Sequence, residues 1–261
     1  MREFRDELSA ALQGNIVGAY LHGSVAFADY EPRAGDIDFY TVVYEPLTKK
    51  EISDLDHMHR SLAAKLESGG KLDGFYIPLA KARKTRNPRG LVYGAHGRVH
   101  SEGFDDAWPL HREHFHMSAC IRLLGPKATS IFPTADWRSL RTALYRQLVY
   151  TRSIIDTAPS WAVLNLCRLV YSFKTGKIVI SKLQAAKWAL RELPSEWAPL
   201  IRSAIRGYRQ IERRGDNSIL RREARKFLGF ASIRIIAYDV IWNTHRPHIA
   251  QFRKRTNAVR S

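Results

Sequence analysis

The sequence predicts an α+β protein, with a small mixed sheet and helices in the N-terminal half and an all-helical C-terminal half. In the first half, apolar runs such as 16–21 and 36–44 have the length of strands and are bounded by turn residues. Beyond residue 133, apolar side chains recur at helical spacing almost throughout. We therefore expect two domains, residues 1–130 and residues 131–261, which a chain of 261 residues can accommodate.

Helices and strands alternate in the first half. Phe4, Leu8 and Leu12 share one face of a helix. Pro78 lacks a backbone N–H, so its strand ends there or lies at a sheet edge. In order, we expect a helix over 2–13, a strand over 16–21, a turn and short helix after Ser24, a strand over 36–44, a helix over 49–67, a strand over 72–79, loops with one short strand over 81–108, and a helix over 108–124.

The second half follows a connection rich in turn residues, 125–133. Thr134 or Asp136 can accept a hydrogen bond from the first turn of the next helix, and Ser181 can do so for a later one. The expected helices run to Leu148, over 161–173, from Ser181 to 193, over 199–211 and over 218–242.

The net charge of +17 is unevenly distributed along the chain. Residues 1–130 carry 17 basic and 17 acidic side chains, whereas residues 131–261 carry 25 basic and 8 acidic ones. Such an excess suggests an anionic partner, such as nucleotide phosphates or nucleic acid. The alternative is a solvated basic face that serves solubility.

Composition also limits the cellular setting. No apolar run approaches the length of a membrane span, and the N-terminus has no apolar segment typical of a secretory signal. Cys120 and Cys167 are too few for a disulfide framework. We expect a cytoplasmic monomer that does not contact a membrane.

The segment 21–38 carries the most specific signal in the chain. Gly23-Ser24 follows one apolar run, and Asp36 and Asp38 open the next. Two residues apart on a strand, both aspartates leave the same face. Neighbouring carboxylates repel one another unless a cation lies between them, and Mg²⁺ is commonly held by one or two carboxylates with substrate phosphates. Gly23-Ser24 adds backbone N–H groups near an expected helix start, so the segment predicts a metal and triphosphate site.

This arrangement resembles the signature of the nucleotidyltransferase superfamily, in which Gly-Ser follows a strand and Asp-x-Asp opens the next. The flanking residues agree, because Ile37 and Phe39 would face a core while both aspartates face the site. The alternative is a surface hairpin with two solvated aspartates. The resemblance implies that Gly23 and Ser24 hold the terminal phosphates and that the two aspartates bind Mg²⁺.

Asp73, in the expected strand 72–79, offers a third carboxylate. In the superfamily, an acid on a neighbouring strand completes the site, either as ligand of a second metal ion or as the base for the attacking hydroxyl. A base must lie within hydrogen-bond reach of the nucleophile. The alternative is an aspartate at a strand end beside a glycine turn.

Residues 164–194 narrow the resemblance. A leucine-rich segment with Arg168 is followed by Thr-Gly-Lys, Lys182, an Ala-Ala-x-Trp-Ala run and Leu-Pro. This order is similar to the helical domain of the streptomycin and spectinomycin adenylyltransferases, a family of aminoglycoside-modifying enzymes of antibiotic resistance. The resemblance implies that Arg168, Lys182 and Tyr208 contact ATP, and that the helical domain completes the nucleotide and acceptor sites. It also makes Asp73 the base, where the family usually has Glu.

The resemblance implies transfer of AMP from Mg-ATP to an acceptor hydroxyl, with release of pyrophosphate. On the acceptor side the chain departs from the family. The family's acidic residue before the leucine-rich helix matches Ala158, which leaves Asp156 as a substitute, and Gly94-Ala95-His96 replaces Gly-Glu-Trp. A polycationic drug is also repelled by the net charge, although salt screens this beyond about 8–10 Å. We expect a small-molecule acceptor of the aminoglycoside type, with His96 and Asp156 at its site.

Two other functions stay open. A nucleotidyltransferase that acts on or binds RNA, or another anionic acceptor, would use the basic C-terminal half, including 245–255. A degenerate fold that serves only as a binding module is the other, and the retained Asp36, Asp38 and Asp73 argue against it.

Overall fold

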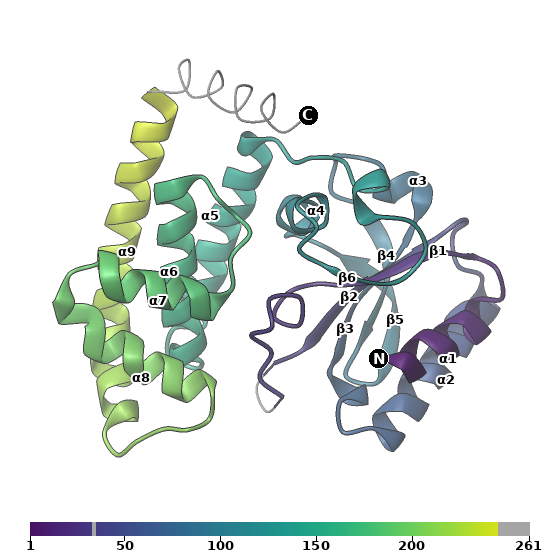
Figure 1. Cartoon of the computed structure of the whole chain (residues 1–261), viewed down its shortest axis with the longest axis horizontal. Coiled ribbons are helices and arrows are strands. Elements are labelled where there is room, and N and C mark those ends of the chain that lie inside the picture. The colour runs from purple at the N-terminus through teal and green to yellow at the C-terminus, as the bar shows by residue number, and fades with distance from the viewer. Residues whose placement is uncertain (33–34, 245–261) are drawn as a thin grey trace. The chain divides into compact units, whose positions relative to one another are not determined.

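The computed structural model describes residues 1–32 and 35–244 and divides the chain into two compact units (Figure 1). The sheet unit comprises residues 1–150 with the short stretches 178–181 and 208–211. The helical unit comprises 151–177, 182–207 and the described residues from 212 onward. The predicted α+β class is confirmed. The sheet unit extends to residue 150, whereas the sequence predicts a domain boundary after residue 130, and that boundary stays a prediction.

Six strands and nine α-helices make up the described chain. The strands are β1 (Ile16–Leu21), β2 (Ile37–Val43), β3 (Leu72–Pro78), β4 (Arg89–Ala95), β5 (Arg98–Phe104) and β6 (Ile121–Leu124). The helices are α1 (Arg2–Leu12), α2 (Lys49–Lys65), α3 (Leu79–Ala82), α4 (Trp108–His116), α5 (Trp137–Ser153), α6 (Pro159–Thr175), α7 (Lys182–Glu192), α8 (Ala198–Tyr208) and α9 (Asp216–Thr244). None of these helices has the length and apolar character that a membrane crossing requires.

The sheet is mixed, with strand order β5-β4-β3-β2-β1-β6. Only β2 and β3 run parallel; the other neighbours are antiparallel. The register of the parallel pair sets Asp38 beside Asp73. Since directly paired residues project from the same face, the two carboxylates leave the sheet together.

Each face of the sheet has its own apolar core. One core contains Phe4 and Leu8 of α1 and Leu55 and Leu62 of α2. The other contains Trp108 and Phe115 of α4 together with Ala128, Ile131 and Phe132. Along β2 the faces alternate: Ile37, Phe39 and Val43 enter the first core, and Tyr40 and Val42 the second. The expectation that Ile37 and Phe39 face a core is confirmed, and Asp38 projects on the face that α4 covers.

A hairpin replaces most of the loop expected over 81–108. β4 and β5 are joined by His96 and Gly97, whose φ angles of 51° and 71° suit a two-residue turn of type I′. β5 lies at the sheet edge and is largely exposed, so its sequence has few apolar residues to mark it as a strand. The one short strand expected within 81–108 corresponds to β4, which is longer than expected, and β5 was missed.

The prediction of one helix over 108–124 is correct for the first half of this segment and wrong for the second half. α4 ends at His116, and Ser118 takes a left-handed φ of 57° just after it. Residues 121–124 form β6, which pairs with β1 and places Ile121 opposite Leu21. Apolar residues in a short segment do not separate helix from strand, and here the open edge of β1 decides the outcome.

In the helical unit, α6 is central. It packs against α7 and α9, and most of its residues from Ala162 to Phe173 are buried (Figure 1). Asp216, at the start of α9, fixes the junction with α8: its carboxylate accepts hydrogen bonds from Ser203 Oγ (2.7 Å), Arg206 Nε (2.7 Å) and Arg213 N (2.8 Å).

Candidate active site

Three carboxylates meet at one end of β2 and β3. Asp38 and Asp73 are half-buried neighbours on the two strands, and Asp36 is exposed just before β2 begins. All three aspartates affect the same group, the Tyr93 hydroxyl of β4. Burial and the hydrogen bond to Asp73 raise the pKa of Tyr93, and the negative charges of the three aspartates raise it further. The structure thus brings together the three acids that the sequence singled out.

The environment of Asp73 suits a proton acceptor. Tyr93 Oη donates a hydrogen bond to Asp73 Oδ1 at 2.6 Å. Burial raises the pKa of the Asp73 carboxyl above its ordinary value, and the charge of Asp36 acts in the same direction, while the Tyr93 hydrogen bond opposes them. A carboxylate with a raised pKa is a better base than a solvated one.

The Gly23-Ser24 turn lies directly against Asp38. The His22 N–H donates to the Asp38 carbonyl oxygen at 3.0 Å, and a Cβ on Gly23 would come within 2.0 Å of Asp38 Oδ2. Gly23 also has a φ of +66°, which favours glycine. This close approach of turn and carboxylate requires a residue without a side chain.

The short helix expected after Ser24 is absent. Residues 23–28 form consecutive turns, closed by the hydrogen bond from Asp29 N to the Ser24 carbonyl at 3.1 Å. The helix dipole therefore contributes nothing at Ser24, because no helix begins there. Any phosphate at this turn would be held by individual N–H groups and the Ser24 hydroxyl.

The carboxylates suit Mg²⁺ only as a partial ligand set. Among residues 1–32 and 35–244, no three His, Cys, Asp or Glu side chains are grouped as metal ligands. Mg²⁺ is commonly bound by one or two carboxylates with phosphate oxygens and water, which Asp36 and Asp38 can provide when ATP supplies the rest. Since Asp73 Oδ1 is engaged by Tyr93, the metal-binding role of Asp73 stays a prediction.

A histidine on α4 lies over the same face and was not assigned to the site from the sequence. His111 Nδ1 bonds Asp105 Oδ2 at 2.9 Å, and that buried carboxylate also accepts from the Tyr40 hydroxyl. Burial alone would lower the pKa of His111, but Asp105 and the more distant charge of Asp38 offset it, so the pKa is raised. The rings of His111 and His22 lie 4.7 Å apart, which extends this cluster to the residue before Gly23.

Residues 130–232 match the family described as aminoglycoside adenylyltransferase, C-terminal domain. The helical half of the chain is therefore similar to the C-terminal domain of the aminoglycoside adenylyltransferases. An aminoglycoside (3'') (9) adenylyltransferase of Klebsiella pneumoniae is 35% identical over 94 residues, which span 34% of this chain and 34% of that protein. A spectinomycin 9-adenylyltransferase of Staphylococcus aureus strain Mu50 is 26% identical over 207 residues, 75% of this chain and 78% of that protein.

The fold of the chain is also found in a solved structure. The crystal structure of spectinomycin adenyltransferase AAD(9) from Enterococcus faecialis, with ATP and spectinomycin, superposes with a TM-score of 0.72. The comparison covers 89% of this chain and 96% of that one, at 18% sequence identity. At this identity the likeness concerns the fold.

The residues that the family resemblance assigns to ATP lie on separate helices. Arg168 is half-buried on α6, and Tyr208 is buried at the end of α8. Lys182 begins α7 and places its ammonium 4.6 Å from the centre of the Trp161 ring. This cation–π contact holds the Lys182 side chain against α6. The nucleotide contacts of all three stay predictions.

The two residues expected on the acceptor side have different surroundings. His96 is exposed in the β4–β5 turn, and its charge lowers the pKa of Asp73, so it lies at the carboxylate end of the sheet. Asp156 is exposed in the helical unit and receives Arg225 Nε at 2.8 Å and a second bond from the same guanidinium. Its charge is thus matched by a cation within its own unit.

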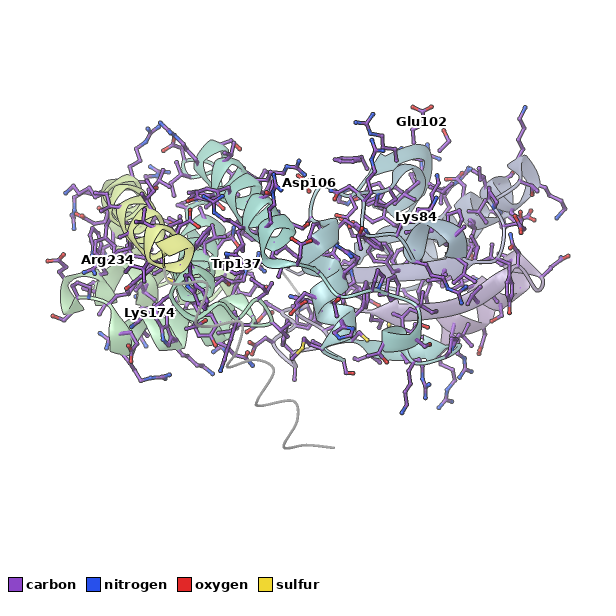
Figure 2. All side chains as sticks on the ribbon, turned by 90° about the horizontal axis from the view of Figure 1, so that it is seen from above. Lys84, Glu102, Asp106, Trp137, Lys174 and Arg234 are labelled. Atoms are coloured by element: carbon purple, nitrogen blue, oxygen red, sulfur yellow. The ribbon has the colours of Figure 1, made fainter. Side chains whose placement is uncertain are left out.

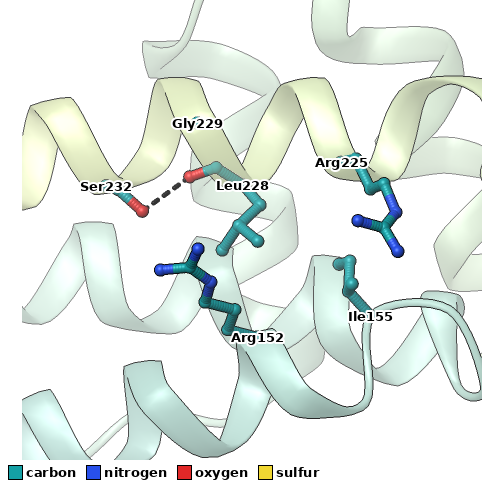
Figure 3. Close-up of a pocket in the computed structure, with 6 residues that line it drawn as sticks. All are labelled: Arg152, Ile155, Arg225, Leu228, Gly229 and Ser232. Carbon is teal, nitrogen blue, oxygen red and sulfur yellow. Dashed lines mark hydrogen bonds between the residues drawn. The ribbon is translucent and has the colours of Figure 1, made fainter.

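Arg225 borders a cavity of about 450 Å³ within the helical unit (Figure 3). The cavity is lined by Arg152, Ile155, Arg225, Leu228, Gly229 and Ser232. Two arginines at one opening favour an anion over a polycationic drug. The surroundings of Asp156 therefore weaken its assignment to a cationic acceptor, which stays a prediction.

Proposed function

We propose that this chain transfers AMP from ATP to a hydroxyl of a small-molecule acceptor of the streptomycin or spectinomycin type and releases pyrophosphate. The observation that carries the proposal is the pairing of Asp38 with Asp73 on neighbouring strands, with Asp36 just before β2, where Asp38 lies against a glycine turn that leaves no room for a side chain. The match over residues 130–232 supports the reaction class, because the similar proteins named above are adenylyltransferases.

The chemical step is an in-line displacement at the α-phosphorus of ATP. The acceptor oxygen forms a bond to that phosphorus while the bond to the bridging oxygen of pyrophosphate breaks. Asp73 takes the proton from the attacking hydroxyl through its second oxygen, Oδ2. The protein's main contribution is to hold the two reactants in line, because positioning supplies much of the rate in such transfers.

Asp36 and Asp38 would hold Mg²⁺, which when bound neutralises charge on the phosphates. Gly23 and Ser24 lie beside this pair, and we assign them to the terminal phosphates. Arg168, Lys182 and Tyr208 complete the proposed nucleotide contacts on the strength of the family resemblance, since guanidinium and ammonium groups donate to phosphate oxygens and a phenol can stack on a base.

Pyrophosphate release tests the proposal. Wild-type protein with Mg-ATP should release pyrophosphate in the presence of streptomycin, spectinomycin or another acceptor from an aminoglycoside panel. Asp38→Asn and Asp73→Asn should lower the rate by about 10²-fold or more. Asp54→Asn is the matched control, because Asp54 is a helix-surface aspartate that pairs with Lys50 on α2. Equal rates for all four proteins would contradict the assigned site.

The basic C-terminal half favours a second candidate, a nucleotidyltransferase acting on or binding RNA or another anionic acceptor. Arg221 and Arg222 of α9 are exposed beside Asn217 and Ser218. Several basic side chains of the helical unit are engaged: Arg222 pairs with Glu223, Lys174 pairs with Glu192, and Arg234 lies over the Phe230 ring. Lys174 and Arg234 are labelled in Figure 2. Segment 245–255 lies outside the described residues. Steeply salt-dependent RNA binding without turnover of any drug would support this candidate.

A further inference from the structure

The Asp73 carboxylate is fixed by a residue from the next strand. β4 runs antiparallel to β3, with Tyr93 opposite Phe75 and Ala95 opposite Asp73. Tyr93 and Asp73 are therefore diagonal neighbours on the same face of the sheet. The distance between such neighbours is spanned only by a long side chain such as tyrosine. The resulting hydrogen bond, Tyr93 Oη to Asp73 Oδ1, measures 2.6 Å.

The Tyr93 side chain is itself held in place from both sides. Its ring centre lies 4.9 Å from that of Phe75 on β3 and 6.2 Å from the stacked His100 ring on β5. These neighbours on two strands restrict the orientation of the Tyr93 ring. Because the hydroxyl is attached to a rigid ring, its position is restricted as well.

We propose that Tyr93 is the positioning residue for the base: its hydroxyl occupies Asp73 Oδ1 and so directs Oδ2 toward the acceptor hydroxyl. This inference rests on the proposed function. An aspartate side chain is short, so the position of its carboxylate depends on the strand backbone and on the orientation of the side chain. The hydrogen bond from Tyr93 selects that orientation.

Kinetics of Tyr93→Phe test the inference, because the substitution keeps the ring and removes only the hydroxyl. We expect kcat for pyrophosphate release to fall by about 10- to 100-fold, the usual effect of losing one hydrogen bond to a charged group. The KM for ATP should change less than about twofold, since Tyr93 touches neither substrate in this proposal. A loss confined to KM, or an unchanged kcat, would overturn the inference.

A double-mutant cycle separates positioning from other effects. If Tyr93 acts through Asp73, then Tyr93→Phe should have no further effect on kcat once Asp73→Asn has removed the base. Multiplying effects would show that Tyr93 acts independently, and the inference would be wrong.

Tyr76→Phe is the matched control. Tyr76 lies on the same strand as Asp73 and bonds His59 Nε2 at 2.7 Å, but its ring packs in the core on the opposite face. We expect it to lower the melting temperature and leave kcat unchanged. An active wild type with a dead Asp73→Asn variant and a normal Tyr93→Phe variant would sink this inference alone. A wild type inactive with every acceptor would overturn the proposed function as well.

Discussion

At the scale of single residues, the contact between Gly23 and Asp38 makes the sharpest prediction. Gly23→Ala places a methyl group where Asp38 Oδ2 now lies, so the carboxylate must move. We expect pyrophosphate release to fall by at least about tenfold, because a displacement of this size misaligns bound groups. The left-handed φ adds a stability cost of about 1 kcal/mol.

Gly14→Ala is the matched control for that substitution. Gly14 has a φ of +94°, and no atom lies within 4 Å of an added Cβ. It should show the backbone cost in a melting curve and keep full activity. If both variants lose activity equally, the contact with Asp38 is not the cause.

The sequence pointed to the three acids but not to Tyr93, which donates a hydrogen bond to Asp73. Asp36 and Asp38 follow from alternation along one strand, because residues two apart share a face. Tyr93 depends on the register between β3 and β4, which fixes a diagonal contact over 20 residues of chain. No local pattern encodes that register, since most of β4 and all of β5 carry little apolar alternation.

His59 makes a residue-scale prediction about pH. Burial lowers the pKa of His59 from 6.5 to about 4, so the folded state holds it neutral while the unfolded chain protonates. Its contribution to stability is therefore complete above pH 6.5 and is lost as pH falls toward 4. At 1.36 kcal/mol per unit, the loss is about 3 kcal/mol.

Denaturant unfolding between pH 7.5 and 4.5 measures this contribution. His59→Gln should flatten the dependence, because glutamine can bond Tyr76 but does not titrate in this range. His57→Gln, an exposed change on the same helix, should leave the slope as in the wild type. Parallel slopes for all three proteins would contradict the assignment.

At the scale of elements, the two main prediction errors share a cause. The helix expected over 108–124 and the loop expected over 81–108 both contain strands at or next to the sheet edges, β6 and β5. Edge strands are exposed on one or both faces, so their sequences lack the alternation that marks central strands such as β2. Central strands and well-capped helices were predicted within a few residues; Asp136, for example, caps α5 through the N–H of Ser139 at 2.9 Å.

The junction of α8 and α9 makes the element-scale prediction. Asp216 is 2% exposed, and the hydrogen bond from Arg206 is the main cause that holds its pKa below the ordinary value. Asp216→Ala should destabilise the helical unit by about 3 kcal/mol, because it leaves the partly buried Arg206 without its partner. Chemical unfolding monitored by circular dichroism measures the loss.

Asp156→Ala is the comparison for that variant, since Asp156 also pairs with an arginine but on the surface. Surface ion pairs contribute little, so its unfolding curve should overlay the wild type. If the two variants are equally destabilised, burial of Asp216 is not what matters.

At the scale of the whole molecule, the positive net charge opposes the approach of a positively charged acceptor. A chain of net charge +17 repels a polycationic drug and attracts RNA, and both effects act over the screening length. That length falls from about 30 Å at 0.01 M salt to about 8 Å at 0.15 M. The sign of the salt dependence therefore distinguishes the two candidate acceptors.

For an aminoglycoside-type acceptor, we predict that its KM decreases as salt rises from 0.01 to 0.15 M, because screening removes the repulsion while kcat stays constant. For RNA, binding should instead weaken steeply over the same range, as counterion release requires. Arg221→Gln, which removes one exposed charge of α9, should lower the drug KM at 0.01 M salt and have no effect at 0.15 M. A drug KM that rises with salt would contradict this prediction, because it would mean that acidic side chains near the acceptor govern its approach more than the net charge does. Asp36 would then be the first residue to substitute, since it is the exposed member of the three aspartates.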